Sequence, residues 1–389
     1  MSHQHLRARF GSFRCALATA VAAACAFASA ARASNNNPYF VSSGMQGEMP
    51  SVAHSSSDLL VFRAAGLGGT GMFGLQPSSP PINGGTILTI RGEAFASPEL
   101  SPPSMSSSGV LAFADFDNGA SSLFVRAFGG DILTIRGENF GQFRSSSVGP
   151  NGTVYSHVTD STGRSSLLAF PPGGQHVTIF GTDFSPSGRA AVNSSGDVAS
   201  RVTGPNGQGL RARAPGGDTI TIVGSNRFTG ISSPASSGHL WIFGGHELSS
   251  GLSGIFAQVP GGDTITIVGE QFLLPQYFTE PAANEAGAIV YGRLAPLNGG
   301  LESIEFTDIY GGPRQTLAAI GDELLGSTIT ELSFNPDGLN EAGEFGYAAR
   351  LADGTTAIMI ASNVPAPGSL MLLGTGAAVY LRRKRREVA

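Results

Sequence analysis

The chain repeats a short alternation of apolar and polar residues, and its clearest copy is the stretch GGDTITIVG from Gly261 to Gly269. Ile265 and Ile267 alternate there with threonine, which is the two-residue period of a β-strand. A glycine pair precedes the run and a single glycine ends it. The pattern predicts a strand with Ile265 and Ile267 on one face.

Copies of this segment, termed TITI strands below, recur at a nearly constant distance. Their closing glycines are 45, 44, 43, 45 and 52 residues apart, the last copy being looser than the others. The apolar pairs, four and two residues before the closing glycine, are Leu88 and Ile90, Leu133 and Ile135, Val177 and Ile179, Ile220 and Ile222, Ile265 and Ile267, and Leu317 and Ala319. Such a long period, with only strand and turn signals inside it, predicts a repeat architecture.

A second element, a turn rich in serine and asparagine followed by an apolar strand, recurs seven times. The turns end at Asp58, Gly109, Gly152, Gly196, Gly238, Gly287 and Gly343, and apolar residues follow two positions later at Leu60, Leu111, Val154, Val198, Leu240, Ile289 and Phe345. Glycine and aspartate suit a turn position with positive φ. A further short strand precedes each glycine pair, and the segment before each turn, such as Phe143–Val148, gives a weaker fourth strand.

Four strands of about 5 to 6 residues with short turns fill about 44 residues, the size of one propeller blade. The predicted fold class is therefore all-β, a seven-bladed β-propeller. The Ser-x-x-Gly turn before an apolar strand resembles the repeats of TolB-like propellers, and Asn335-Pro336-Asp337-Gly338 comes nearest to their Ser-Pro-Asp-Gly motif. A two-coil β-solenoid is the alternative.

Seven turns but only six TITI strands are present, and the deficit falls in the last repeat. We predict that Tyr39–Gly44 fills this place as the outermost strand of the last blade and pairs with Ala357–Ala361. A ring closed in this way has no unpaired seam, whereas a solenoid needs no closing strand. By its position in the repeat, Phe40 should be buried like Ile220 and Ile265.

The N-terminus, residues 1–33, has the features of a secretory signal peptide. Arg7, Arg9 and Arg14 precede an apolar run that ends at Ala28, and Ala-Arg-Ala at 31–33 gives a cleavage site through Ala31 and Ala33. The alternative, a membrane anchor, needs a longer apolar run.

The C-terminus, residues 364–389, has three consecutive parts. Val364, Pro365, Ala366 and Pro367 come first, an apolar segment follows, and Arg382, Arg383, Lys384, Arg385 and Arg386 end the pattern. It resembles the PEP-CTERM sorting signal, with Ala366 where the family usually has glutamate. The resemblance implies processing by exosortase, a membrane-embedded enzyme of Gram-negative bacteria that make exopolysaccharide.

The apolar segment also predicts a transmembrane helix at 369–381. Residues 364–381 would span about 27 Å as a helix, which barely crosses the hydrocarbon core and suits transient anchoring in the inner membrane. The basic residues after it would hold the tail in the cytoplasm. An ordinary single-span tail anchor is the alternative.

The exported part, residues 34–363, has no cysteine, which excludes disulfides and cysteine catalysis. Its 14 arginines and 27 acids give a net charge of −13, which argues against nucleic acid as a partner.

Candidate chemistry is sparse. The exported histidines are His54, His157, His176, His239 and His246, and acids follow the TITI strands at Glu93, Glu138, Asp183, Glu270 and Asp322. The histidines show no metal-ligand spacing, so we expect them on the surface or in turns. The acids should lie at the outer rim, where charge opposes pairing between sheet edges. Asp115–Gly119 resembles part of a calcium loop without its last ligand, so we expect a solvated turn. The sequence predicts no catalytic, cofactor-binding or metal-binding residue.

These features favour a non-enzymatic protein of the cell envelope or extracellular matrix, with the propeller as an interaction scaffold among exopolysaccharide. The alternative is a polysaccharide-active hydrolase or lyase with its site at the central channel. Convergence of His, Tyr, Arg or acidic side chains from several blades would favour the enzyme. The insertions around Leu273–Glu280 and Leu324–Leu339 are the places where a specialised site is expected.

Overall fold

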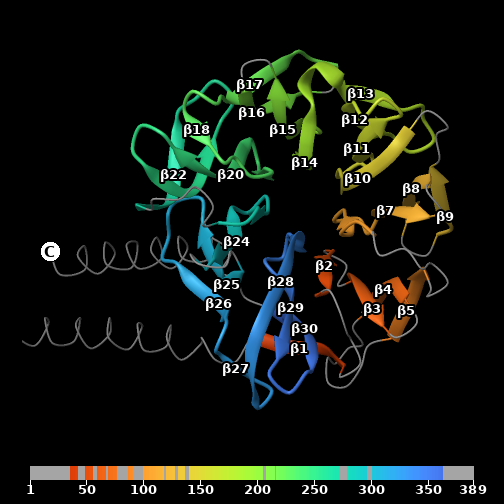
Figure 1. The fold of residues 1–389 in the computed structure, drawn as a ribbon, viewed down its shortest axis with the longest axis vertical. Helices are drawn as coiled ribbons and strands as arrows, with labels where there is room; N and C mark the ends of the chain where they lie inside the picture. The colour runs from red at the N-terminus through yellow and green to blue at the C-terminus, as the bar shows by residue number, and fades with distance from the viewer. Residues whose placement is uncertain are drawn as a thin grey trace, which may run out of the picture. The chain divides into compact units, whose positions relative to one another are not determined.

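The computed structural model describes residues 36–42, 49–55, 59–66, 69–76, 86–91, 100–117, 120–127, 130–135, 140–204, 207–214, 216–271, 278–295 and 300–361. Those from Pro38 onwards belong to one compact unit. Their strands form seven antiparallel sheets, arranged as blades around a ring in Figure 1. The predicted seven-bladed propeller is thus confirmed, and the solenoid alternative is wrong.

The first six blades each follow the chain from the centre of the ring outwards. The first blade contains β2 (Ser51–His54), β3 (Leu60–Gly66), β4 (Gly69–Gln76) and β5 (Thr86–Arg91), and the second contains β6 (Ser104–Met105), β7 (Leu111–Asp117), β8 (Ala120–Arg126) and β9 (Ile132–Ile135). The third contains β10 (Phe140–Val148), β11 (Val154–Asp160), β12 (Ser165–Phe170) and β13 (Val177–Phe180), and the fourth contains β14 (Pro186–Val192), β15 (Val198–Gly204), β16 (Gly207–Arg213) and β17 (Thr219–Val223). The fifth contains β18 (Phe228–Thr229), β19 (Ala235–Ser237), β20 (Leu240–Glu247), β21 (Leu252–Gln258) and β22 (Thr264–Gln271), and the sixth contains β23 (Ala282–Ala283), β24 (Ala288–Leu294), β25 (Leu301–Asp308) and β26 (Gln315–Ala319). A 3-10 turn, η2 (Thr182–Phe184), follows β13.

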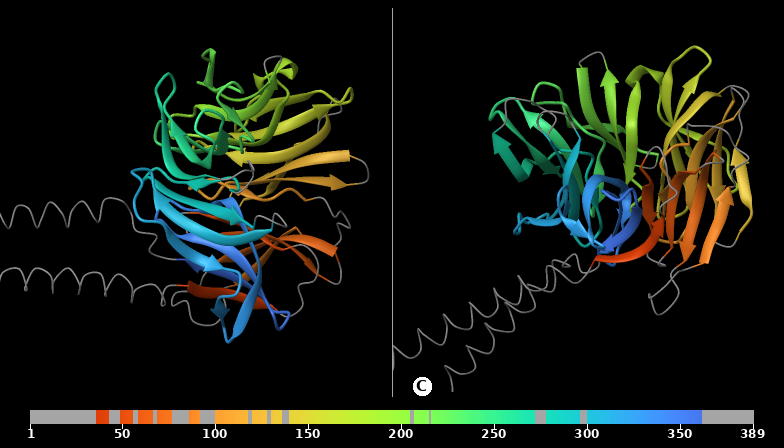
Figure 2. Two further views of the ribbon diagram at one scale, coloured as in Figure 1. Left: turned by 60° about the vertical axis from the view of Figure 1, so that its left-hand side comes forward. Right: turned by 60° about the horizontal axis from the view of Figure 1, so that its bottom comes forward.

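The seventh blade joins the two ends of the described chain. Its strands are β27 (Glu323–Leu324), β28 (Ser327–Leu339), β29 (Phe345–Leu351), β30 (Thr356–Ala361) and β1 (Asn36–Ser42), and β1 lies next to β30 as predicted. In both views of Figure 2 the red strand β1 lies against the blue strands of this blade. The side chain of Phe40 is not among those that the structure describes, so its predicted burial stays a prediction. The predicted signal peptide and C-terminal helix also lie outside the described residues. No helix in the described ranges is long and apolar enough to cross a membrane.

The hydrophobic core is divided between the blades rather than gathered at one centre. The buried residues form seven clusters, and one cluster lies between each pair of adjacent blades. Between the fourth and fifth blades, Ile222 packs with Trp241 and Phe256. Between the seventh and first, Ile358 and Ile360 pack with residues of the first blade. The ring closes through packed side chains as well as through β1.

The TITI strands are the outermost strands, but the two apolar residues of a copy can differ in burial. In β17 the register shifts by one residue, because Leu210 pairs with Val223 while Arg211 pairs with Thr221. Ile222 is therefore the extra residue of a β-bulge. Ile222 is 4% exposed, whereas Ile220 is 42% exposed, so the expected burial of Ile220 is wrong.

The same bulge recurs around the ring. It leaves one extra residue in the outer strand at Ile90, Ile179, Ile222, Ile267 and Leu317. Ile265 is 48% exposed, so the expected burial of that residue is also wrong. In the last copy the extra residue of the bulge is Leu317, whereas the sequence pattern aligned Ala319 with Ile267. The looser copy is therefore offset by two residues from that alignment.

The turn prediction holds in every turn that the structure describes. The six glycines expected at these positions all have positive φ, between 58° and 87°. The residue that begins the turn also fixes it by hydrogen bonding. The main-chain N–H of Asp197 donates to Asn193 Oδ1 over 2.8 Å, and that of Glu344 donates to Asn340 Oδ1 over 2.8 Å. The serine and asparagine content of the turns thus has a structural cause.

Candidate binding site in the central channel

The innermost strands line a channel with mostly short side chains. Serine and asparagine residues tie neighbouring inner strands together, four of the bonds at about one repeat length and the fifth, from Asn340 to Ser55, across the closure of the ring. The bonds are Val148 N to Ser104 Oγ (3.0 Å), Ser147 Oγ to Ala190 O (2.5 Å), Ser236 Oγ to Val192 O (3.0 Å), Asn284 Nδ2 to Asn340 O (3.0 Å) and Asn340 Nδ2 to Ser55 O (3.3 Å). These polar residues therefore hold the blades in register at the axis.

Blade seven departs from the repeat at the predicted insertion. Between Phe334, opposite Tyr347, and Leu339, opposite Phe345, β28 has four residues where its partner has one. This segment, Asn335–Gly338, is termed the channel bulge. Glycine is required at its end, because a Cβ on Gly338 would lie 2.5 Å from Gly346 O.

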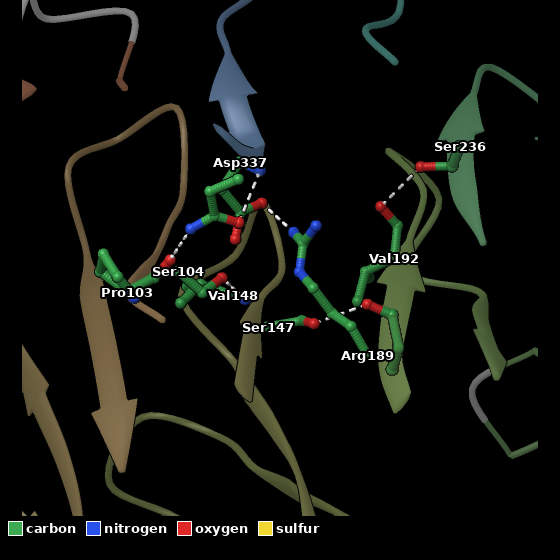
Figure 3. Close-up of polar contacts among 10 residues, drawn as sticks. Pro103, Ser104, Ser147, Val148, Arg189, Val192, Ser236 and Asp337 are labelled. Atoms are coloured by element: carbon green, nitrogen blue, oxygen red, sulfur yellow. Dashed lines mark hydrogen bonds and ion pairs between the residues drawn. The ribbon is translucent and has the colours of Figure 1, made fainter. Parts of the chain in front are cut away.

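The channel bulge reaches two other blades. Asn335 Nδ2 donates to Pro103 O of the second blade over 2.6 Å. Asp337 forms an ion pair with Arg189 of β14 in the fourth blade, as Figure 3 shows. Residues 148 positions apart in the sequence thus meet across the channel.

Arg189 is held from its main chain as well as from its side chain. Its N–H donates to Ser233 Oγ over 2.9 Å, and Ser233 in turn donates to Glu280. Burial lowers the pKa of Arg189 to about 10, and the nearby Glu280 carboxylate opposes that fall. Arg189 therefore stays charged at neutral pH.

The rim of the channel on the side of the inner turns is acidic. Glu285 N–H donates to Glu341 Oε2 over 3.0 Å, and Glu285 itself accepts from Gly238 N–H over 3.0 Å. Burial and the neighbouring Glu285 carboxylate raise the pKa of Glu341. Two carboxylates from adjacent blades thus lie side by side at this mouth.

The insertion at Leu324–Leu339 supplies Asp337 to the channel lining, and Glu280, at the end of the other insertion, accepts a hydrogen bond from Ser233. The sequence analysis did not single out Arg189, whose role depends on the ring bringing the fourth and seventh blades together. The one signal that could have marked it is a large charged residue on an inner strand where other repeats have a small or polar residue.

The histidines depart in part from expectation. His176, His239 and His246 are exposed or half-buried, but His54 and His157 are each 3% exposed. His157 Nε2 lies 3.1 Å from Ser200 Oγ of the next blade. Burial, with smaller effects from Arg201 and Arg144, lowers the pKa of His157 to about 4 although a main-chain contact with Gly188 opposes the fall. The expectation of surface or turn positions is therefore wrong for these two, because they fill the interior of the ring.

The acidic candidates also depart in part from expectation. Glu270 pairs with Arg314 of the sixth blade at 2.5 Å, and Asp322 accepts the main-chain N–H of Ala319 over 2.8 Å. Asp115 is 1% exposed within β7 and is not part of a solvated turn. Glu93 and Glu138 lie outside the described residues. Within the described ranges, no three His, Cys, Asp or Glu side chains gather as metal ligands.

Comparison with known proteins adds a match at the C-terminus and a match to the fold. Residues 363–386 match the PEP-CTERM protein-sorting motif. No curated protein sequence matches the chain significantly.

Two solved structures show the fold. One, from a study of two prolyl endopeptidases, aligns with a TM-score of 0.56 at 13% identity and covers 78% of this chain and 46% of that one. The present chain thus spans about half the length of that protein. An oligogalacturonate lyase from Vibrio parahaemolyticus aligns with a TM-score of 0.57 at 12% identity and covers 85% of this chain and 93% of that one.

The sorting motif is a signal for exosortase processing and implies export to the cell envelope. The low identities to the solved structures show the fold alone. This chain is therefore a seven-bladed β-propeller that carries a PEP-CTERM sorting motif.

Proposed function

We propose that this protein is a non-enzymatic surface protein of a Gram-negative bacterium, released or attached among exopolysaccharide, with the propeller as its binding scaffold. The sorting motif at 363–386 carries this proposal. In it, the predicted helix at 369–381 anchors the chain transiently in the inner membrane until exosortase processes it near Pro365.

The chemistry of the channel supports binding over catalysis. Ser147 and Ser236 donate their hydroxyl protons to main-chain carbonyl oxygens, whereas a nucleophilic serine needs a neighbouring base to take its proton. Arg189 and Asp337 are engaged with each other. These contacts join blades, which supports a scaffold role.

The proposal is tested by fractionating cells that produce the full chain, a variant truncated after Asn363, or the full chain in a strain unable to make exopolysaccharide. We expect surface retention only for the full chain in the parent strain, and release to the medium in the other two. Equal retention in all three would contradict the proposal. Purified protein should also release no new reducing ends from the host polysaccharide. Steady release would favour the hydrolase or lyase alternative.

A further inference from the structure

The sorting motif is attached to the propeller on the face that carries the serine- and asparagine-rich turns, termed the inner turns. The last strand, β30, ends at Ala361, which pairs with Phe345. Phe345 directly follows the inner turn of the seventh blade, at 340–344. Ala361 is 4% exposed and belongs to the same buried cluster as Ala288 and Phe306 of the sixth blade. The chain therefore leaves the fold beside the inner turns of these two blades.

The proposed cleavage point lies close to this attachment. Residues 362–365 separate Ala361 from the bond near Pro365, and a segment of this length reaches at most about 14 Å. By the same rule the predicted transmembrane helix at 369–381 begins within about 29 Å of Ala361. An active site extends well beyond one peptide bond, because it must also bind and orient its substrate. A membrane-embedded enzyme that acts near Pro365 must therefore lie against the surface around Ala361.

The inner turns at this attachment are acidic. Of the seven inner turns only those of the sixth and seventh blades contain glutamate, in the identical sequence Asn-Glu-Ala-Gly at 284–287 and 340–343. Glu285 and Glu341 are both exposed, and the main-chain N–H of Glu285 donates to Glu341 Oε2 over 3.0 Å. The two carboxylates thus form one acidic patch where the sorting motif is attached.

An exposed tyrosine adjoins the two glutamates. Tyr310 is 75% exposed, the largest exposed fraction among the large hydrophobic residues that the structure describes. The main-chain N–H of Ile309 donates to Gly287 O over 3.0 Å, so the turn that holds Tyr310 lies against the inner turn of Glu285. An aromatic ring left in water forgoes the gain from burial, whereas tyrosine is enriched among the residues that dominate protein–protein interfaces. The ring and the carboxylates together have the chemistry of a protein-binding surface.

We propose that Glu285, Tyr310 and Glu341, termed the exit surface, form a docking site for the part of the sorting enzyme that lies outside the membrane. The two carboxylates pair with basic side chains of the enzyme, and Tyr310 packs against it. Lipid head groups are the other surface within reach, and anionic ones would be repelled by the carboxylates. This inference rests on the proposed processing near Pro365, and it adds the folded propeller to the features by which the enzyme recognises its substrate.

The test measures how fast the full-length chain is processed in cells with active exosortase, by pulse labelling and chase. The exit-surface variant combines Glu285→Gln, Glu341→Gln and Tyr310→Ser, and each glutamine keeps an oxygen that can accept the main-chain N–H. The matched control combines Glu323→Gln, Leu325→Ser and Asp353→Asn, whose exposed positions lie at the opposite end of the seventh blade. We expect the exit-surface variant to be processed about fivefold more slowly or worse, and the control at the parent rate.

A longer linker separates docking from obstruction. An insertion of about 12 glycine and serine residues after Asn363 moves the cleavage point away from the exit surface and lowers the effective concentration of one site at the other. We expect slower processing of this chain, and a smaller effect of the exit-surface substitutions within it. Faster processing would show that the propeller hinders the enzyme instead of binding it.

The inference is overturned if the exit-surface variant is processed as fast as the control, or if the longer linker leaves processing unchanged or accelerates it. It is also overturned if the mature protein floats with vesicles of phosphatidylethanolamine and phosphatidylglycerol and the exit-surface variant does not, because the surface would then bind lipid. Unfolding midpoints in urea check that the variant is folded, and the linker insertion tests the inference without changing the propeller. A parent chain that is never processed would refute the proposed function, whereas equal processing of all chains refutes this inference alone.

Discussion

Two isoleucines of one TITI strand, two positions apart, should differ sharply in their contribution to stability. Ile222, at the β-bulge of β17, is 4% exposed, whereas Ile220, opposite Ala212, is 42% exposed. Ile222 packs in the cluster that joins the fourth and fifth blades.

The expected costs follow from that burial. Ile222→Ala removes buried carbon atoms and leaves a cavity, which should lower the free energy of unfolding by about 2–5 kcal/mol. Ile220→Ala leaves no enclosed cavity and loses only part of the transfer free energy of its side chain, so it should cost about 1 kcal/mol. Both variants replace isoleucine with alanine in the same strand, at positions two residues apart.

Urea unfolding of the full-length protein in detergent measures both. Trp241, the single tryptophan of the chain, is buried in the same cluster as Ile222, so its fluorescence reports this junction. Circular dichroism should give a coincident transition if unfolding is two-state. Equal losses for the two variants, or a larger loss for Ile220→Ala, would refute the burial assigned to these two side chains.

Further predictions concern the bulge, the closing strand and a buried histidine. A Cβ at Gly254 would collide with the main-chain oxygen of Val268, so Gly254→Ala should cost about 1–3 kcal/mol, while Gly181→Ala, with no atom within 4 Å, should be neutral or slightly stabilising in the same urea assay. Deleting residues 35–44 should remove β1, expose the edge of β30, lower the melting temperature and promote aggregation in light scattering; an unchanged melting temperature would contradict closure by this strand. His157 has a folded pKa of about 4 against an ordinary 6.5, so the unfolded state binds its proton first and stability should fall as pH drops from 6.5 to 4, by at most about 1.4 kcal/mol per pH unit. His157→Gln should flatten this slope in unfolding curves at pH 7, 6 and 5, and an unaltered slope would show that other groups cause it.

The repeat and its closure could be predicted from the sequence because they depend on local chemistry and on counting. A glycine with positive φ at Gly109 or Gly343 is required by the turn itself. The missing seventh TITI strand followed from comparing two counts, and β1 beside β30 confirms it.

The facing of residues within the TITI strands could not be predicted in the same way. One extra residue in a strand leaves the composition unchanged but turns every residue beyond it to the other face. The opposing strand does hold a sign, since Gly209 and Gly254 leave room for the main-chain oxygens of Val223 and Val268. That sign is legible only once the pairing register is known.

The residues that meet in the channel could not be predicted from the sequence. Arg189 and Asp337 meet because the ring places the fourth blade across from the channel bulge, and no local pattern links residues so distant in sequence. The insertion in the last repeat did mark where the departure would occur, but not which partner it would find.

Sorting through the C-terminal motif is tested most directly by intact-protein mass spectrometry of the material recovered from the exopolysaccharide fraction. We expect a species that begins near Ser34 and ends near Pro365, enriched in that fraction and absent from it when exosortase is deleted. A chain that still ends at Ala389, found in the inner membrane or cytoplasm of cells with active exosortase, would contradict the account.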